Sequence, residues 1–186
     1  MENLAALLAD KPASERIEVL RARGFCYQCY DLETDGGVFG QQPHVYDDSH
    51  IRVVLESRPR MAGHAIVIYK PHHDDLSSLT DAEAGYVFAV CTRCVRAIKR
   101  AMGAEKVYLN TMCDGGINHL HLQLFPRYPG ESIGSRRFVL PRGVPEDSDA
   151  IAARIRGALL AEGAMPVFPA ASFPEHRTSN TDPRER

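Results

Sequence analysis

The stretch GGINHLHLQLFPRY, residues 115–128, decides the fold of this chain. Within it, leucine alternates strictly with His119, His121 and Gln123. Because successive side chains of a strand point to opposite faces, this alternation predicts a strand with one apolar and one polar face. The polar side chains then lie within about 7 Å of one another along the strand. A half-exposed strand facing water would show the same alternation, but the preceding Gly-Gly loop favours a phosphate site beside the row.

The composition is that of a single soluble globular domain. The 186 residues are 44% hydrophobic and 25% charged, with a formal net charge of −2. This balance predicts no nucleic-acid surface, and no apolar run approaches the roughly 20 residues that a membrane helix needs. The first 24 residues are charged and helical in pattern, unlike a signal peptide. Together with five cysteines, this predicts a reducing, cytoplasmic location.

The order of the expected elements indicates the fold class. Strand, strand, helix, strand, strand is typical of an α+β fold, here an antiparallel sheet of about five strands with helices packed on it. The long helix has an expected capping box at Thr80 and Glu83 and a C-cap at Gly103. The other expected elements are helical pieces in 1–23, a compact loop at 25–37, strands at 44–57 (two pieces), 64–69 and 106–112, and a C-terminal helix at 145–163.

Three segments, in this order and spacing, resemble the histidine-triad (HIT) superfamily of nucleotidyl hydrolases and transferases. They are VYDDSHIRVVLESRPRMAGHAIVIYKPHHDDLSSL, NTMCDGGINHLHLQLFPRY and RRFVLPR. The resemblance covers residues 44–162 and implies a HIT-like core there, within a single domain of residues 1–170. It leaves an N-terminal extension, 1–43, and a tail, 171–186, whose polar composition predicts disorder.

The resemblance implies an enzyme that forms a covalent nucleotidyl-histidine on His121. Gln123 stands where most members have a third histidine, and this resembles the nucleotidyltransferase and phosphorylase branch. Because glutamine does not titrate, leaving groups and acceptors that are already phosphates are expected. The alternatives are a phosphoramidase-like hydrolase and a nucleotide-binding sensor or adaptor with little turnover. The family also implies a homodimer.

The remaining expected site residues follow from the same resemblance. His119 and Gln123 would assist His121 in catalysis, and Glu56 would bind the ribose hydroxyls unless it is only an exposed charge at a strand end. Arg127 is expected to be a surface residue, with a phosphate contact as the alternative. The other expected nucleotide contacts are Asn110, Gly115, Gly116, Ile117 and Asn118.

Cys26-x-x-Cys29 is half of a tetrahedral zinc site by its spacing. Zinc-bearing family members, as this sequence resembles them, complete the site with His72 and His119, with His73 as the neighbouring rival. Such a zinc would be structural, because four protein ligands leave no open position. A reduced cysteine pair and a redox pair are the alternatives.

Two further features have structural interpretations. Cys91-x-x-Cys94 lies among apolar residues of the long helix, and buried cysteines behave as small hydrophobes, so these two are expected in the core. His64, at the start of a strand, is expected to be a structural residue of the fold.

Overall fold

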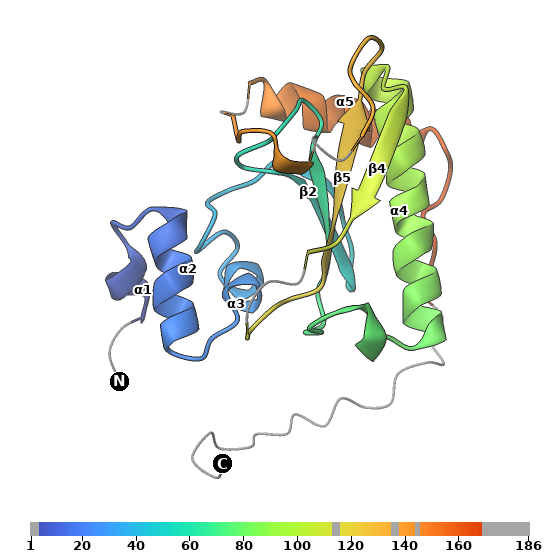
Figure 1. The fold of residues 1–186 in the computed structure, drawn as a ribbon. Helices are drawn as coiled ribbons and strands as arrows, with labels where there is room; N and C mark the ends of the chain where they lie inside the picture. Colours follow the sequence, from blue (N-terminus) through green and yellow to red (C-terminus); the bar gives the residue numbers. More distant parts are fainter. Residues whose placement is uncertain (1–3, 113–115, 135–137, 144–145, 169–186) are drawn as a thin grey trace.

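The centre of the protein is a five-stranded antiparallel sheet with strand order β1-β2-β3-β5-β4 (Figure 1). The computed structural model describes residues 4–112, 116–134, 138–143 and 146–168. The predicted α+β architecture is confirmed. The strands are β1 His44–Asp47, β2 Ile51–Leu55, β3 Ala65–Tyr69, β4 Lys106–Asn110 and β5 His121–Arg127.

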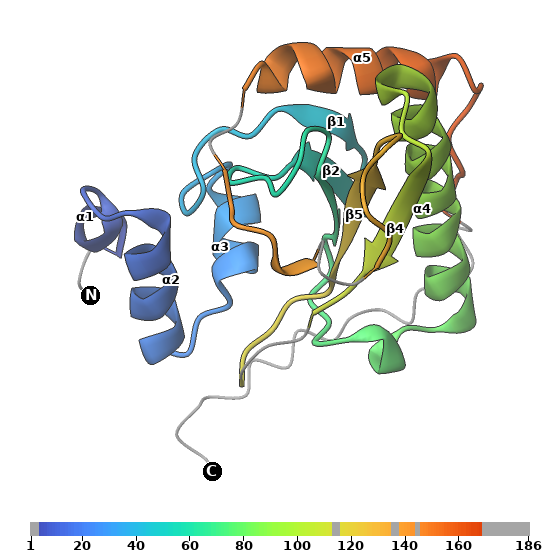
Figure 2. The same ribbon diagram turned by 45° about the horizontal axis from the view of Figure 1, so that its top comes forward.

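Helices cover both faces of this sheet. The long helix α4 lies along one face, and the N-terminal helices lie on the other side (Figures 1 and 2). Helix α5 packs against α4 and the edge strand β1. The helices are α1 Leu4–Leu8, α2 Ala13–Ala22, α3 Tyr27–Glu33, the short 3₁₀ helix η1 Leu76–Ser78, α4 Asp81–Met102 and α5 Ser148–Leu160.

The period-two pattern of the strands separates a core face from a site face. Leu120, Leu122 and Leu124 have no exposed surface and pack with α4 in the main core. Cys91 and Cys94 belong to the same core, as predicted. The residues between the leucines therefore face the N-terminal helices, where polar side chains can serve a site.

Helix α4 begins and ends where its sequence predicts. The Thr80 hydroxyl accepts the N–H of Glu83, the Glu83 carboxylate accepts the N–H of Thr80, and Gly103 adopts the left-handed conformation at φ 70°. Residues with a Cβ rarely adopt that conformation, so glycine is the natural end of this helix.

The structure corrects two details. The expected loop around Cys26 contains helix α3, because the Cys26 sulfur accepts the N–H of Cys29 and caps that helix. Strand β5 begins at His121, so His119 lies in the segment before it. The tail 171–186 lies outside the described residues. Within the described part of the chain, no helix is long and apolar enough to cross a membrane.

Candidate active site and metal cluster

A cavity of about 170 Å³ lies between the site face of the sheet and the N-terminal helices. His121 and Gln123 form part of its floor, next to Ile66 and Ile68 of the neighbouring strand β3. Side chains from α2 and α3 and from the segment after α3 form the opposite wall. The lining residues are Ile17, Tyr27, Gln28, Phe39, Gln42, Val54, Glu56, Ser57, Arg58, Ile66, Ile68, His121, Gln123 and Arg142.

The ring of His121 is held in one orientation by its own backbone neighbourhood. Its Nδ1 lies 2.8 Å from the carbonyl oxygen of His119. A carbonyl can only accept a hydrogen bond, so Nδ1 carries the proton of the neutral ring and Nε2 carries the lone pair. The backbone at this point is fixed further by the Thr111 hydroxyl, which donates to the His121 carbonyl at 2.9 Å. The side chain thus presents an unprotonated nitrogen, the form that a nucleophile needs.

Gln123 is buried beside His121, with 4% of its surface exposed. Its Oε1 lies 3.2 Å from Nε2 of His64, a residue of the β2–β3 connection. In the sheet it pairs with Asn110 of β4. Directly opposed residues of antiparallel strands share a face, so Asn110 lies on the site face, although it does not line the cavity.

Glu56 lines the cavity at the end of β2 and is 9% exposed. Its Oε1 accepts hydrogen bonds from the Ser57 hydroxyl and the Arg58 N–H, each at 3.1 Å, and its Oε2 lies 3.1 Å from Nη1 of Arg142. Burial alone would raise the pKa of Glu56, but the Arg58 N–H and the charge of Arg142 lower it below its usual value. The carboxylate is therefore ionised and already bonded to an arginine in the same cavity.

The loop residues that were expected to contact the nucleotide do not line the cavity where the structure describes them. Gly115 lies outside the described residues. Gly116 and Ile117 are described but do not line the cavity. Asn118 is buried, and its amide donates to the carbonyl of Asp74, which ties this loop to the turn that follows β3.

Arg127 has a structural partner rather than a place in the cavity. Its Nη1 lies 2.8 Å from a carboxylate oxygen of Glu105 and 3.3 Å from the carbonyl of Glu131. The side chain is only 5% exposed, so its description as a surface residue is wrong.

Four side chains that the sequence singled out for zinc come together in one cluster: Cys26, Cys29, His72 and His119. Their ligand atoms all lie within 4.8 Å of one another. Nδ1 of His119 is 3.5 Å from the Cys26 sulfur and 3.3 Å from the Cys29 sulfur, and Nδ1 of His72 is 3.3 Å from the Cys29 sulfur. Ideal zinc–sulfur and zinc–nitrogen distances in a tetrahedron give ligand separations of about 3.3–3.8 Å. The cluster thus has the size and the donor set of a structural zinc site.

The second ring nitrogens of both histidines face groups that orient them. His119 Nε2 lies 2.7 Å from the Tyr69 carbonyl, so it must donate there, and the lone pair of Nδ1 points to the cysteines. His72 Nε2 lies 3.6 Å from a carboxylate oxygen of Asp74. A carbonyl or carboxylate behind a histidine is the usual arrangement at a metal centre.

His73 faces away from this cluster. Its Nδ1 lies 2.9 Å from the Ser78 hydroxyl, and its Nε2 is 3.7 Å from the buried carboxylate of Glu83. That carboxylate also accepts the Tyr69 hydroxyl at 2.7 Å. Of the two adjacent histidines, the structure therefore brings only His72 to the cysteines.

The cysteine pair shares a proton when no cation is present. A hydrogen bond from the Cys29 thiol lowers the pKa of Cys26 to about 3, with a smaller contribution from His119. The same bond raises the pKa of Cys29. A divalent cation between the two sulfurs would bind both cysteines as thiolates, so that neither sulfur would keep the shared proton.

Part of the cavity was missed in the sequence. Ile17, Tyr27 and Phe39 form an apolar wall, with Tyr27 and Phe39 in an edge-to-face contact at 6.0 Å. Arg142 reaches the cavity from the segment before α5. In the sequence, this wall is indicated only by the aromatic residues Tyr27, within the cysteine motif, and Phe39, after it. No residue near Arg142 in the sequence indicates that Glu56 is its partner.

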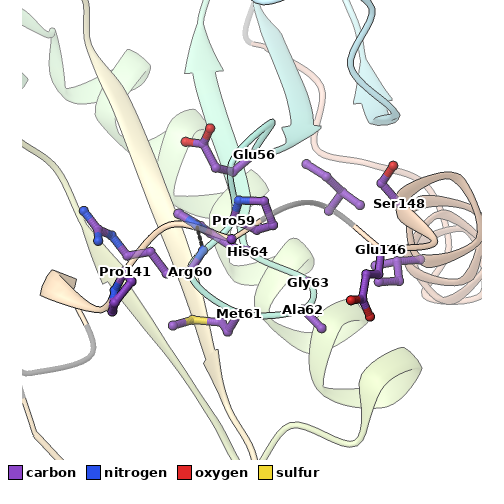
Figure 3. A pocket seen from close by; sticks show the side chains of 13 residues that line it. Glu56, Pro59, Arg60, Met61, Ala62, Gly63, His64, Pro141, Glu146 and Ser148 are labelled. Atoms are coloured by element: carbon purple, nitrogen blue, oxygen red, sulfur yellow. Dashed lines mark hydrogen bonds between the residues drawn. The ribbon is translucent and has the colours of Figure 1, made fainter.

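A second cavity, of about 230 Å³, lies on the other side of Glu56 (Figure 3). Its walls come from the β2–β3 connection and from the start of α5. His64 and Arg60 lie side by side in it, and no residue of the histidine row lines it. His121 therefore belongs to the first cavity and not to the described part of the second.

Comparisons with known proteins agree with this fold and these residues. The family model of the HIT domain matches residues 41–130. An uncharacterized HIT-like protein of Methanocaldococcus jannaschii is 30% identical over 90 residues, which are 47% of this chain and 70% of the relative. The chain belongs to the HIT family.

Two solved structures show the same fold. A Zn-bound histidine triad family protein from Mycobacterium smegmatis superposes with a TM-score of 0.60 at 23% identity, over 74% of this chain and 94% of its own. A uridylyltransferase superposes with a TM-score of 0.59 at 16% identity, over 85% of this chain and 51% of its own.

Proposed function

We propose that this protein is an enzyme that cleaves a nucleotide or dinucleotide at its α-phosphate and holds the nucleotidyl group on His121. The observation that carries the proposal is the short contact between His121 Nδ1 and the His119 carbonyl oxygen. A hydrogen bond to the His119 carbonyl keeps the proton on Nδ1 and leaves Nε2 as the nucleophile, on the floor of a cavity.

The reaction needs two displacements at phosphorus. His121 Nε2 attacks the α-phosphorus, a P–N bond forms, and the P–O bond to the leaving group breaks, so that the leaving group departs with its electron pair as a phosphate-type anion. The ring gains a positive charge, which the His119 carbonyl stabilises through Nδ1–H. An acceptor oxygen then attacks the phosphorus, the P–N bond breaks, and the neutral ring is restored.

The cavity offers a partner for each part of a nucleotide. The apolar wall of Ile17 and Phe39 suits a base. Glu56 suits the ribose hydroxyls once its bond to Arg142 is exchanged, and the released guanidinium would then meet phosphate oxygens. Gln123 beside His121 can donate an amide N–H to the phosphoryl group.

Gln123 favours transfer over hydrolysis. A third histidine could protonate an alkoxide or amine leaving group, whereas an amide cannot. Phosphate and phosphate esters leave and attack as anions, so they need no such proton. The uridylyltransferase among the structural relatives supports this assignment, and water remains the competing acceptor.

The metal cluster would support this reaction by holding in place the residues that position His121. The cluster residues Cys26, Cys29, His72 and His119 fit one Zn²⁺ with four protein ligands, and the Zn-bound relative supports this metal. Zinc would supply a cross-link and no chemical step. It would anchor the residue whose carbonyl fixes the ring of His121.

We propose that the extension 1–43 and the HIT core 44–162 form one domain, because the extension supplies one wall of the cavity and two of the four cluster residues. Homodimer formation is a separate proposal, for which light scattering of the purified protein is the direct test.

The test is to trap the nucleotide on the protein. The protein is incubated with nucleotide sugars and dinucleoside polyphosphates, quenched, and analysed by peptide mass spectrometry for a nucleotidyl adduct on His121. The reaction is then repeated with inorganic phosphate, with sugar phosphates and with water alone.

The proposal predicts an adduct on His121 that discharges faster to phosphate or a phosphate ester than to water. Water as the only productive acceptor, with ready cleavage of nucleoside phosphoramidates, would establish the hydrolase instead. Nucleotide binding with neither adduct nor turnover would establish the sensor or adaptor.

A further inference from the structure

His64 is a buried histidine that the reaction described above does not use. It precedes β3, its side chain has no exposed surface, and its ring stacks on Phe125 at a centroid distance of 4.3 Å. It lies beside Arg60 in the wall of the second cavity (Figure 3). Through its far edge it contacts Gln123, which lies in the first cavity. The ring therefore joins the wall of the second cavity to Gln123 in the first.

The two ring nitrogens of His64 have different partners, and these fix its tautomer. The backbone N–H of Arg60 points at Nδ1 with a separation of 3.4 Å. A backbone N–H can only donate, so Nδ1 must accept, and the proton of the neutral ring must be on Nε2. Burial, the largest effect, lowers the pKa of His64 to about 4 even though the charge of Glu56 opposes the shift. The ring is thus neutral at neutral pH, with its only N–H at Nε2.

That N–H decides which end of the Gln123 amide faces it. An amide oxygen and an amide nitrogen have nearly the same shape, so packing alone does not distinguish the two orientations. His64 Nε2–H can bond only to the oxygen, which lies 3.2 Å away. The NH₂ group of Gln123 is then directed away from His64.

We propose that His64 is a positioning residue that fixes the Gln123 amide so that its NH₂ group, and not its oxygen, meets the phosphoryl group held on His121. The inference rests on the proposed function. The opposite orientation would place the amide oxygen against phosphoryl oxygens, where two acceptors repel each other. A donor that is already aimed before the substrate binds is worth more to a phosphoryl transition state than one that must reorient.

The first test needs no substrate. Long-range ¹H–¹⁵N correlation spectra of histidine-labelled, zinc-loaded protein at pH 7 identify which nitrogen of each ring carries the proton. The His64 signals are assigned by their loss in His64→Gln. A neutral ring with its proton on Nε2 supports the proposal. A proton on Nδ1, or a doubly protonated ring, overturns it.

The second test is a double-mutant cycle on the rate of adduct formation. His64→Met fills the site with a flexible apolar side chain and removes the donor. Gln123→Met removes the amide. His50→Gln is the matched control, because His50 stacks on Phe168 and does not line either cavity. Circular dichroism and zinc content verify that each variant is folded.

The effect of His64→Met on the rate of adduct formation should depend on whether Gln123 is present. Gln123→Met should slow adduct formation by about 100-fold, the effect of losing one aimed donor. His64→Met should slow it about tenfold in the wild-type background and less than about twofold when residue 123 is methionine. His64→Gln, whose amide N–H can reach the position of Nε2, should recover most of the rate, and His50→Gln should match the wild type.

Equal losses from His64→Met in both backgrounds would show a merely structural role and overturn the proposal. The two proposals fail separately. If the wild-type protein forms no adduct with any donor, the proposed function fails, and the tautomer of His64 still decides whether the Gln123 amide is aimed as described.

Discussion

Lowering the pH from 7.5 to 4.5 should destabilise the protein by about 2–3 kcal/mol through one buried side chain, the ring of His64. Burial, and to a smaller extent the charges of Arg142 and Arg60, lower its pKa to about 4, although Glu56 and the bond to Gln123 act in the opposite direction. In the unfolded chain the ring regains a pKa near 6.5.

The sign and size of the effect follow from this difference. Between pH 6.5 and about 4, the unfolded state binds a proton that the native ring does not, so stability falls as the pH falls. One pKa unit corresponds to about 1.4 kcal/mol. The loss should therefore reach about 2 kcal/mol at pH 5 and about 3 kcal/mol near pH 4.

Urea unfolding followed by circular dichroism, at half-unit intervals of pH, measures this loss. The informative quantity is the difference between wild type and His64→Met at each pH. Both proteins have the same cysteines and zinc-site histidines, so the acid sensitivity of that cluster cancels. His50→Gln controls for the removal of a histidine elsewhere. If the wild-type and His64→Met curves stay parallel from pH 7.5 to 4.5, His64 is not a neutral buried ring, and the reasoning about its tautomer is wrong.

Three further outcomes are expected. Elemental analysis should give one zinc per chain for the wild type and for His73→Ala, and clearly less for His72→Ala; zinc loss in His73→Ala with retention in His72→Ala would reverse the ligand assignment. His121→Asn should keep the zinc and the circular dichroism spectrum but form no nucleotidyl adduct, and an adduct on the variant would place the nucleophile elsewhere. Phe39→Ala should weaken nucleotide binding about 10- to 100-fold by calorimetry, since burying an aromatic side chain contributes about 1.5–3 kcal/mol, and it should leave the zinc content unchanged; unaltered affinity would show that the base does not use this wall.

The sheet and its long helix were predictable because their signals are local. The alternation around His121 needs only the period of a strand, and the ends of α4 need only Thr80, Glu83 and Gly103. These residues act within one or two turns of their own position. No distant partner has to be known for such a prediction to succeed.

The arrangement of the site was less accessible for the opposite reason. His72 and His73 are neighbours in sequence, and only the course of the turn after β3 decides which of them reaches the cysteines. The pair of Glu56 and Arg142 joins residues 86 positions apart. The orientation of Gln123 depends on a hydrogen bond to His64. No pattern of residue types in the sequence indicates that bond.

The helix at the cysteine motif was missed because its cap is unusual. Ser, Thr, Asp and Asn are the residues that signal a helix N-terminus. Here the sulfur of Cys26 accepts the N–H of Cys29 at 3.4 Å. A cysteine in a predicted metal loop gives no separate indication of that role.

The cavity wall formed by Ile17, Tyr27 and Phe39 has a practical consequence for work on related proteins. The shared HIT domain spans residues 41–130, so it includes the histidine row but neither this wall nor the two cluster cysteines. A fragment cut at those boundaries would keep His121, the proposed nucleophile, and lose the apolar wall proposed to bind the base.

The residues that react with the substrate and the residues that select it would therefore lie in separate segments of the chain. Two relatives aligned only over the shared domain can agree at every reacting atom and still accept different nucleotides. When a substrate is assigned from similarity within that domain, the residues before position 41 and the residue at the position of Arg142 should also be compared.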